Sequence, residues 1–182
     1  ALAHVLAWRS YTLVELARVD DAFACARPPA PDEGACRITS YPYFKWLGGL
    51  GLALNISGDF ARAREVAQGL IEQGHSSRSA RGEGLGHWVM ASHWFYTLDF
   101  ERAAAAGRAG LDCSKDPLFR AGAVLMQASA LLADMRADAA LALTSQWAPL
   151  LERNQDYWFG LPMRQAHAAA QLAHGRLSDG MR

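Results

Sequence analysis

The chain has 182 residues, of which 51% are hydrophobic and 20% charged, so it can bury a sizeable core. Its 18 basic and 18 acidic residues cancel, which leaves no positive excess to neutralise phosphates and argues against direct nucleic-acid binding. Three widely spaced cysteines without a CxxC motif argue against a disulfide scaffold and favour a reducing cytoplasm, and no apolar stretch reaches the roughly 18–20 residues that cross a bilayer.

The first predicted pair of helices spans residues 2–18 and 20–27. The sequence Pro28-Pro29-Ala30-Pro31 ends this pair, because each proline removes a backbone donor and disfavours helix in the residue before it. Residues 28–38 are therefore predicted to form a loop of more than average length.

The second predicted pair spans residues 40–57 and 60–73. Leu47, Leu50 and Leu54 recur at i, i+3 and i+7, which places them on one helical face. Gly58 can adopt the left-handed conformation that ends a helix, and Asp59 is placed to cap the next one. This pattern predicts an antiparallel helical hairpin.

Further helices are predicted at 84–97, 99–112, 117–134, 136–152 and 158–174. Residues 75–84, rich in Ser, Arg and Gly, are predicted to be a flexible connector. Its Ser76–Arg81 run is interpreted as a solvated linker rather than a modification site or basic contact. Gly82, Gly84 and Gly86 resemble half of a dinucleotide fingerprint, but no strand precedes them, so they predict a flexible helix start.

A small residue recurs in the second helix of each pair, at spacings of 41, 40, 37 and 40 residues, namely at Ala22, Ala63, Ala103, Ala140 and Gly180. Such regularity predicts a repeat architecture in which neighbouring pairs stack into one continuous core over residues 1–182. The absence of an initial Met and the end at Arg182 suggest a piece of a longer protein. The last pair stops inside its second helix, so we expect its first helix to cap the array or to form a homodimer.

The repeat resembles the tetratricopeptide repeat (TPR). The shared features are large and small residues in the first helix, the turns Gly58-Asp59-Phe60 and Leu98-Asp99-Phe100, and alanine in the second helix. The unit is longer than the usual 34 residues. Residues 83–182 are similar to a stretched variant found C-terminal to the ATPase module of bacterial class III nucleotide cyclases and large transcriptional activators. The motifs are Asp116-Pro117 followed by 128–141, and Tyr157-Trp158 followed by 175–180.

The resemblance implies an all-α, right-handed solenoid of antiparallel helix pairs, with four to five repeats of about 40 residues. It also implies that the first helices line a concave face, which would carry Lys45, Leu52, Asn55, Trp88, Ser92, Phe95, Tyr96, Ser129 and Gln165. Aromatic rings beside polar groups suit a peptide-binding groove. The alternative is that these rings only pack between neighbouring helices. The aromatic runs at 41–46 and 157–159 are interpreted as wedges between repeats rather than as a ligand shelf.

No catalytic or metal-binding constellation is visible in the sequence. His167 and His174 share a helical face, but a separation of seven residues places them about 10.5 Å apart, too far to share one zinc ion. HExxH, GxSxG and P-loop motifs do not occur. The acids are scattered, and four of them are interpreted as helix starts: Asp59, Asp99, Asp116 and Asp156.

These patterns predict an interaction or regulatory module without catalysis, cofactor or metal, and the resemblance implies that it belongs to a bacterial signalling or transcription-regulating protein. Its partner would be a protein, a peptide or an adjoining effector domain, and not nucleic acid or a membrane. The alternative function is a regulatory domain that senses a small molecule in an aromatic pocket.

Overall fold

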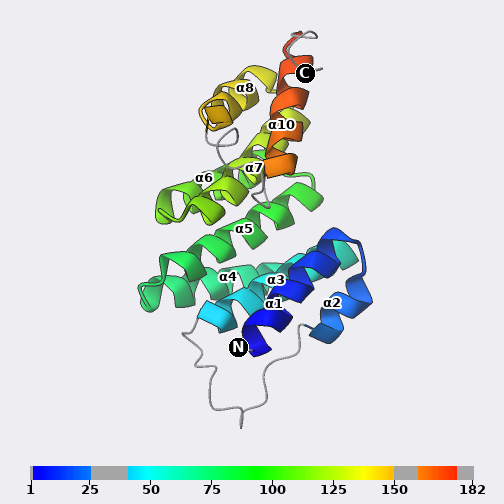
Figure 1. The fold of residues 1–182 in the computed structure, drawn as a ribbon, viewed down its shortest axis with the longest axis vertical. Coiled ribbons are helices and arrows are strands. Elements are labelled where there is room, and N and C mark those ends of the chain that lie inside the picture. The colour runs from blue at the N-terminus through cyan, green and yellow to red at the C-terminus, as the bar shows by residue number, and fades with distance from the viewer. Residues whose placement is uncertain (1, 26–40, 150–159, 176–182) are drawn as a thin grey trace.

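The computed structural model describes residues 2–25, 41–149 and 160–175 (Figure 1). Within these ranges the regular structure is α-helical and no strand occurs. The helices in chain order are α1 Leu2–Glu15, α2 Val19–Cys25, α3 Tyr41–Ser57, α4 Phe60–Ser76, α5 Ala80–Tyr96, α6 Phe100–Cys113, α7 Pro117–Ala133, α8 Ala137–Ser145 and α10 Gly160–Ala173. In this part of the chain, no helix has the length and apolar character needed to cross a bilayer.

The helices stack in chain order, from α1 and α2 at one end to α10 at the other (Figure 1). The first helices contact one another in the order α1, α3, α5, α7 and α10, and so form one layer. The second helices α4, α6 and α8 each pack against the first helix that precedes them and the one that follows. The predicted solenoid of antiparallel pairs is confirmed.

A backbone residue with positive φ ends the first helix of each pair. These residues are Ala17 (φ 55°), Gly58 (83°), Leu98 (63°), Met135 (58°) and Gly175 (86°). Each lies five positions before a small residue of the predicted repeat, so both series share the same spacings. Four of the small residues are completely buried, namely Ala22, Ala63, Ala103 and Ala140, whereas Gly180 lies outside the described residues.

Two of the predicted helix caps are confirmed by hydrogen bonds. The Asp59 side chain accepts from the Arg62 backbone N–H, and the Asp99 side chain accepts from the Arg102 backbone N–H. Asp116 directly precedes Pro117, the first residue of α7, a position that proline tolerates because its missing N–H would be unsatisfied there. Asp116 therefore lies at a helix start as predicted, and its carboxylate also pairs with Arg81 at 2.9 Å, which ties α5 to the start of α7. Asp156 lies outside the described residues.

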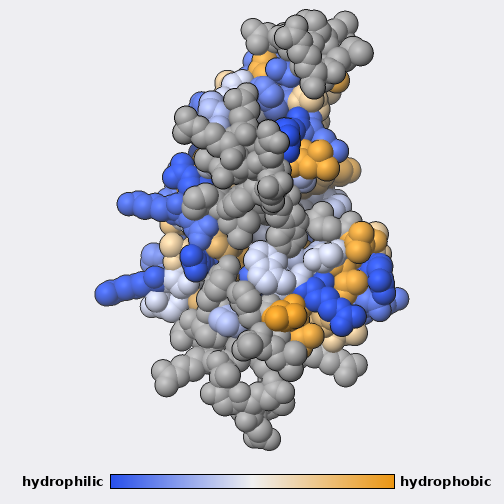
Figure 2. All heavy atoms as spheres, viewed as in Figure 1, coloured by the Kyte–Doolittle hydropathy of each residue, from blue (hydrophilic) through white to orange (hydrophobic). Residues whose placement is uncertain are grey.

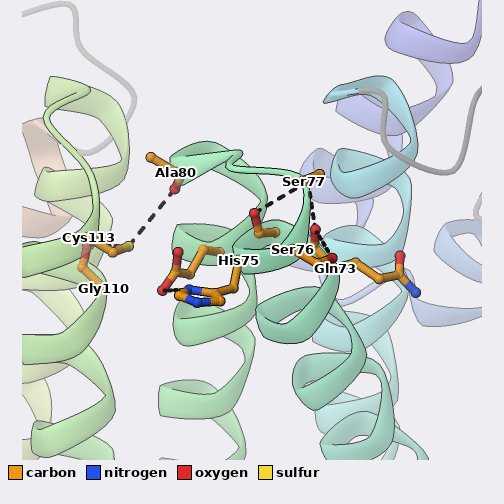
Figure 3. Close-up of polar contacts among 9 residues, drawn as sticks. Gln73, His75, Ser76, Ser77, Ala80, Gly110 and Cys113 are labelled. Atoms are coloured by element: carbon orange, nitrogen blue, oxygen red, sulfur yellow. Dashed lines mark hydrogen bonds and ion pairs between the residues drawn. The ribbon is translucent and has the colours of Figure 1, made fainter.

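The connector predicted at residues 75–84 is wrong. Helix α4 continues to Ser76 and α5 begins at Ala80, so the turn is only three residues long. The Ser77 hydroxyl donates to the Gln73 carbonyl at 2.6 Å, and the Ser79 side chain caps α5 by accepting from the Gly82 N–H. Figure 3 shows this junction, together with the contact between the Cys113 thiol of α6 and the Ala80 carbonyl. Serine-rich composition therefore marks helix caps here rather than a linker.

The glycines predicted to form a flexible helix start lie inside α5 and are buried. A Cβ atom at Gly82 would lie 2.7 Å from the Phe44 ring, and one at Gly86 would lie 2.7 Å from the Ile71 backbone nitrogen. These glycines allow α3 and α4 to approach the α5 backbone closely. Close packing explains them, as it does Gly51, whose added Cβ would lie 2.5 Å from Val89.

The helix predicted at 136–152 is interrupted within its described part, because residues 146–147 form a turn before residues 148–149 become helical again. Helix α8 ends at Ser145, four residues before Pro149. A proline ring clashes with the carbonyl of the residue four positions earlier, so a continuous helix through Pro149 would be strained at Ser145. The described part of the last predicted helix is α10, which begins at Gly160.

Besides Asp156, the loop at 28–38, the aromatic run at 157–159 and the last small position at Gly180 lie outside the described residues. The other aromatic run is described from Pro42 onward at the level of side chains. Phe44 in that run is completely buried in the core, which agrees with the interpretation as a wedge between repeats.

Candidate functional site

A hollow of about 410 Å³ opens on the layer of first helices, near their C-terminal ends. Helices α1, α3, α5 and α7 all contribute to it, so it spans four consecutive repeats. Its lining residues are Val14, Ala17, Leu52, Ile56, Trp88, Ser92, Phe95, Tyr96, Met126 and Ser129. We call this hollow the groove.

Six of the nine residues predicted for the concave face meet in the groove: Leu52, Trp88, Ser92, Phe95, Tyr96 and Ser129. Helix α5 supplies four of them, because positions i, i+4, i+7 and i+8 lie on one helical face. The predicted spacing in α5 is therefore what brings these side chains together.

The aromatic rings of α5 both pack between helices and line the groove. Trp88 stacks on Tyr11 of α1, with ring centroids 5.7 Å apart, and is half-buried between two clusters of the core. Phe95 lies 5.7 Å from Phe100 of α6, whereas Tyr96 remains 45% exposed. The two interpretations of these rings are compatible, since one face of a ring can be buried while its edge lines the wall.

Lys45 does not lie in the groove. Its side chain is only 2% exposed, and its Nζ lies 3.1 Å from the centre of the Trp8 ring, a cation–π contact. Burial, assisted by the positive charge of Arg81, lowers the pKa of Lys45 to about 8. The structure therefore places this lysine in the packing between α1 and α3.

Asn55 and Gln165 also lie apart from the groove. The Asn55 amide is 1% exposed and donates to the Val89 carbonyl at 3.1 Å, which joins α3 to α5. Gln165 is exposed on α10, whose helix contributes nothing to the described lining. Three of the predicted positions thus belong to helix packing or to a separate surface.

Four lining residues were missed from the sequence: Val14, Ala17, Ile56 and Met126. Counting back from the residue with positive φ would have found two of them. Val14 lies three positions before its turn residue, as Phe95 does, and Ile56 lies two positions before, as Tyr96 does. The number of residues between a side chain and the turn of its repeat thus indicates whether that side chain lines the groove. The sequence did not locate the ends of the helices closely enough to apply this relation.

His167 of α10 and His174, which directly follows α10, both contact side chains of α8. His167 Nδ1 lies 2.9 Å from the Thr144 hydroxyl, and His174 pairs with Asp138. Burial lowers the pKa of His167. Among the described residues, no group of three His, Cys, Asp or Glu side chains is arranged to hold a metal ion.

Two crystal structures share this fold, and both show nearly identical TPR-like repeats of a Podosopora anserina protein described as a kinesin light chain. One superposes with a TM-score of 0.63 over 100% of this chain and 92% of the other; the second, a variant, gives 0.64 over 97% and 88%. The sequences are 13% identical in both cases, so the likeness concerns the fold alone. No protein-family model and no curated protein matches the sequence.

The chain thus has an all-α, TPR-like repeat fold. Stacked helical repeats of this class present extended surfaces that generally bind other proteins.

Proposed function

We propose that this chain is a protein-interaction module without its own catalysis, which binds a segment of a partner protein in the groove. The observation that carries the proposal is the convergence of four first helices on one hollow lined by Trp88, Phe95 and Tyr96. Rigid aromatic side chains give large contact area at little entropic cost, which is why they dominate binding hot spots. The resemblance of residues 83–182 supports a place in a bacterial, cytoplasmic signalling or transcription-regulating protein, where the partner could be an adjoining effector domain.

The test is selection of binders from a phage-displayed library of random peptides, followed by affinity measurement on purified variants. Tyr96→Ala and Ile56→Lys alter exposed parts of the lining, so each should weaken the selected peptides about tenfold, or about 1.4 kcal/mol. Leu161→Lys is the matched control, because Leu161 is 62% exposed on α10 and outside the groove. Failure to select any peptide, or equal affinity in all variants, would contradict the proposal.

A second candidate function is small-molecule sensing, because about 410 Å³ falls within the usual size range of ligand pockets. A ligand at 100 times its Kd would stabilise the chain by about 2.7 kcal/mol. Thermal unfolding against a metabolite library measures this directly. A stabilising metabolite whose effect disappears in Tyr96→Ala would favour sensing over peptide binding.

A further inference from the structure

We infer that the partner segment is uncharged and apolar where it enters the groove, and that it continues over the adjoining turn edge onto Leu98 and Met135. This inference rests on the proposed function and specifies the chemistry of the partner. The turn edge is defined here as the three positive-φ residues Ala17, Leu98 and Met135.

The groove selects against charge. None of its ten described lining residues is Lys, Arg, Asp, Glu or His, and their polar groups are two serine hydroxyls, the Trp88 indole and the Tyr96 phenol. A carboxylate or ammonium group would lose its hydration there without an ionic partner, which is costly. Electrostatic complementarity therefore favours a partner segment with apolar side chains. The backbone of that segment would lie within reach of the serine hydroxyls.

The turn edge borders the groove directly. Ala17, the positive-φ residue of the first pair, belongs to the lining. Leu98 and Met135 occupy the equivalent position in the third and fourth pairs, and Leu98 is only two residues beyond the lining residue Tyr96. Figure 2 shows hydrophobic side chains beside hydrophilic ones at the edge where α1 turns into α2, whereas the coloured side chains at the opposite edge, where α4 meets α5 and α6 meets α7, are mainly hydrophilic.

Leu98 and Met135 are unfavourable residues for the isolated fold. Both adopt the left-handed conformation, which is unfavourable for a residue with a Cβ atom, and glycine takes this position at 58 and 175. They gain little from burial, because Leu98 is 74% exposed and Met135 is 89% exposed. Large apolar side chains at strained, exposed positions are explained if a partner covers them.

The experiment measures the affinity of the selected peptides for variants of this chain. Leu98→Asn and Met135→Asn remove the apolar side chains, and asparagine tolerates the left-handed conformation, so the free energy of unfolding should stay equal or rise. The double variant should nevertheless bind the peptides about tenfold more weakly. Leu161→Gln on α10 is the control and should leave the affinity unchanged. Unchanged affinity in the double variant would overturn the part of the inference that concerns the turn edge.

The neutrality of the segment is tested with the same peptides at low and high salt. The inference predicts selected peptides rich in apolar residues, with affinity that changes less than about twofold between roughly 50 mM and 500 mM NaCl, and no preference for a free C-terminal carboxylate over an amide. Enrichment of Asp and Glu, or strong weakening by salt, would overturn the inference while leaving groove binding intact. If no peptide binds, both the inference and the proposed function fail.

Discussion

At the scale of single residues, one position shows how the repeat tolerates variation. His93 of α5 is 5% exposed and packs its ring against Phe60 and Trp94, at centroid distances of 6.1 and 4.7 Å. The equivalent position, five residues before the positive-φ turn, holds Ala53 in the second pair and Ala130 in the fourth. In the third pair the imidazole fills space next to an arginine, Arg64, whose guanidinium lies over Trp94.

This environment predicts that His93 makes the stability depend on pH. Burial first, and then the charge of Arg64, lowers the pKa of His93 below its ordinary value of 6.5. The unfolded chain then binds a proton at a higher pH than the folded chain, so the free energy of unfolding falls as pH decreases through 6.5. The loss should be smaller in His93→Ala than in the wild type, as measured by urea unfolding between pH 8 and 5. Parallel curves for the two proteins would contradict this account of His93.

At the scale of elements, glycine positions distinguish helix contacts from open helix surface. Gly74 and Gly69 both lie in α4, but only Gly74 lies against the neighbouring helix. A Cβ atom at Gly74 would clash with the Glu83 backbone nitrogen of α5, whereas one at Gly69 would meet nothing within 4 Å. The contact at Gly74 involves backbone, which cannot rotate away.

The two glycines predict opposite effects of the same substitution. Gly74→Ala should force α4 and α5 apart and destabilise the chain by about 2 kcal/mol or more. Gly69→Ala should stabilise it by about 0.5–1 kcal/mol, because alanine favours helix over glycine and nothing obstructs the methyl group. Chemical unfolding of both variants provides the measurement. A stabilised Gly74→Ala protein would mean that α4 and α5 are not packed as closely as the structure places them.

The sequence predicted helices and repeat register well, because both depend on local signals. Asp59 and Asp99 cap helices, and four small residues are buried where the spacing required them. The prediction failed where composition was ambiguous, because serine and glycine are common both in flexible linkers and in tight helix junctions. Ser77 and Ser79 became caps, and Gly82 and Gly86 became contact points, only through neighbours distant in the sequence.

The candidate site was predicted less completely than the fold, and for a geometric reason. Helix periodicity correctly grouped Trp88, Ser92 and Phe95 on one face of α5. It could not say how far each neighbouring helix is rotated, so Lys45 and Asn55 were assigned to the surface although they are buried. Rotation is set by packing between helices, as in the hydrogen bond from Asn55 to the Val89 carbonyl.

At the scale of the whole molecule, the tryptophans on the two faces of the solenoid have different neighbouring residues. Trp88 lies on the groove, among first helices. Trp94, six residues later on the same helix, lies between arginines of two second helices, with Arg64 at 5.3 Å and Arg102 at 4.8 Å from its ring centre. Helix α5 therefore carries one tryptophan on each face of the solenoid, and each tryptophan can report binding on its own face.

These two tryptophans allow binding of a partner in the groove to be tested by fluorine NMR. The chain is labelled with 5-fluorotryptophan, the fluorine resonances of Trp88 and Trp94 are assigned with Trp→Phe variants, and a selected peptide is added to saturation. If the peptide binds in the groove, the Trp88 resonance shifts and the Trp94 resonance stays in place. A shift at Trp94 with no change at Trp88 would place the binding surface on the second helices and contradict binding in the groove.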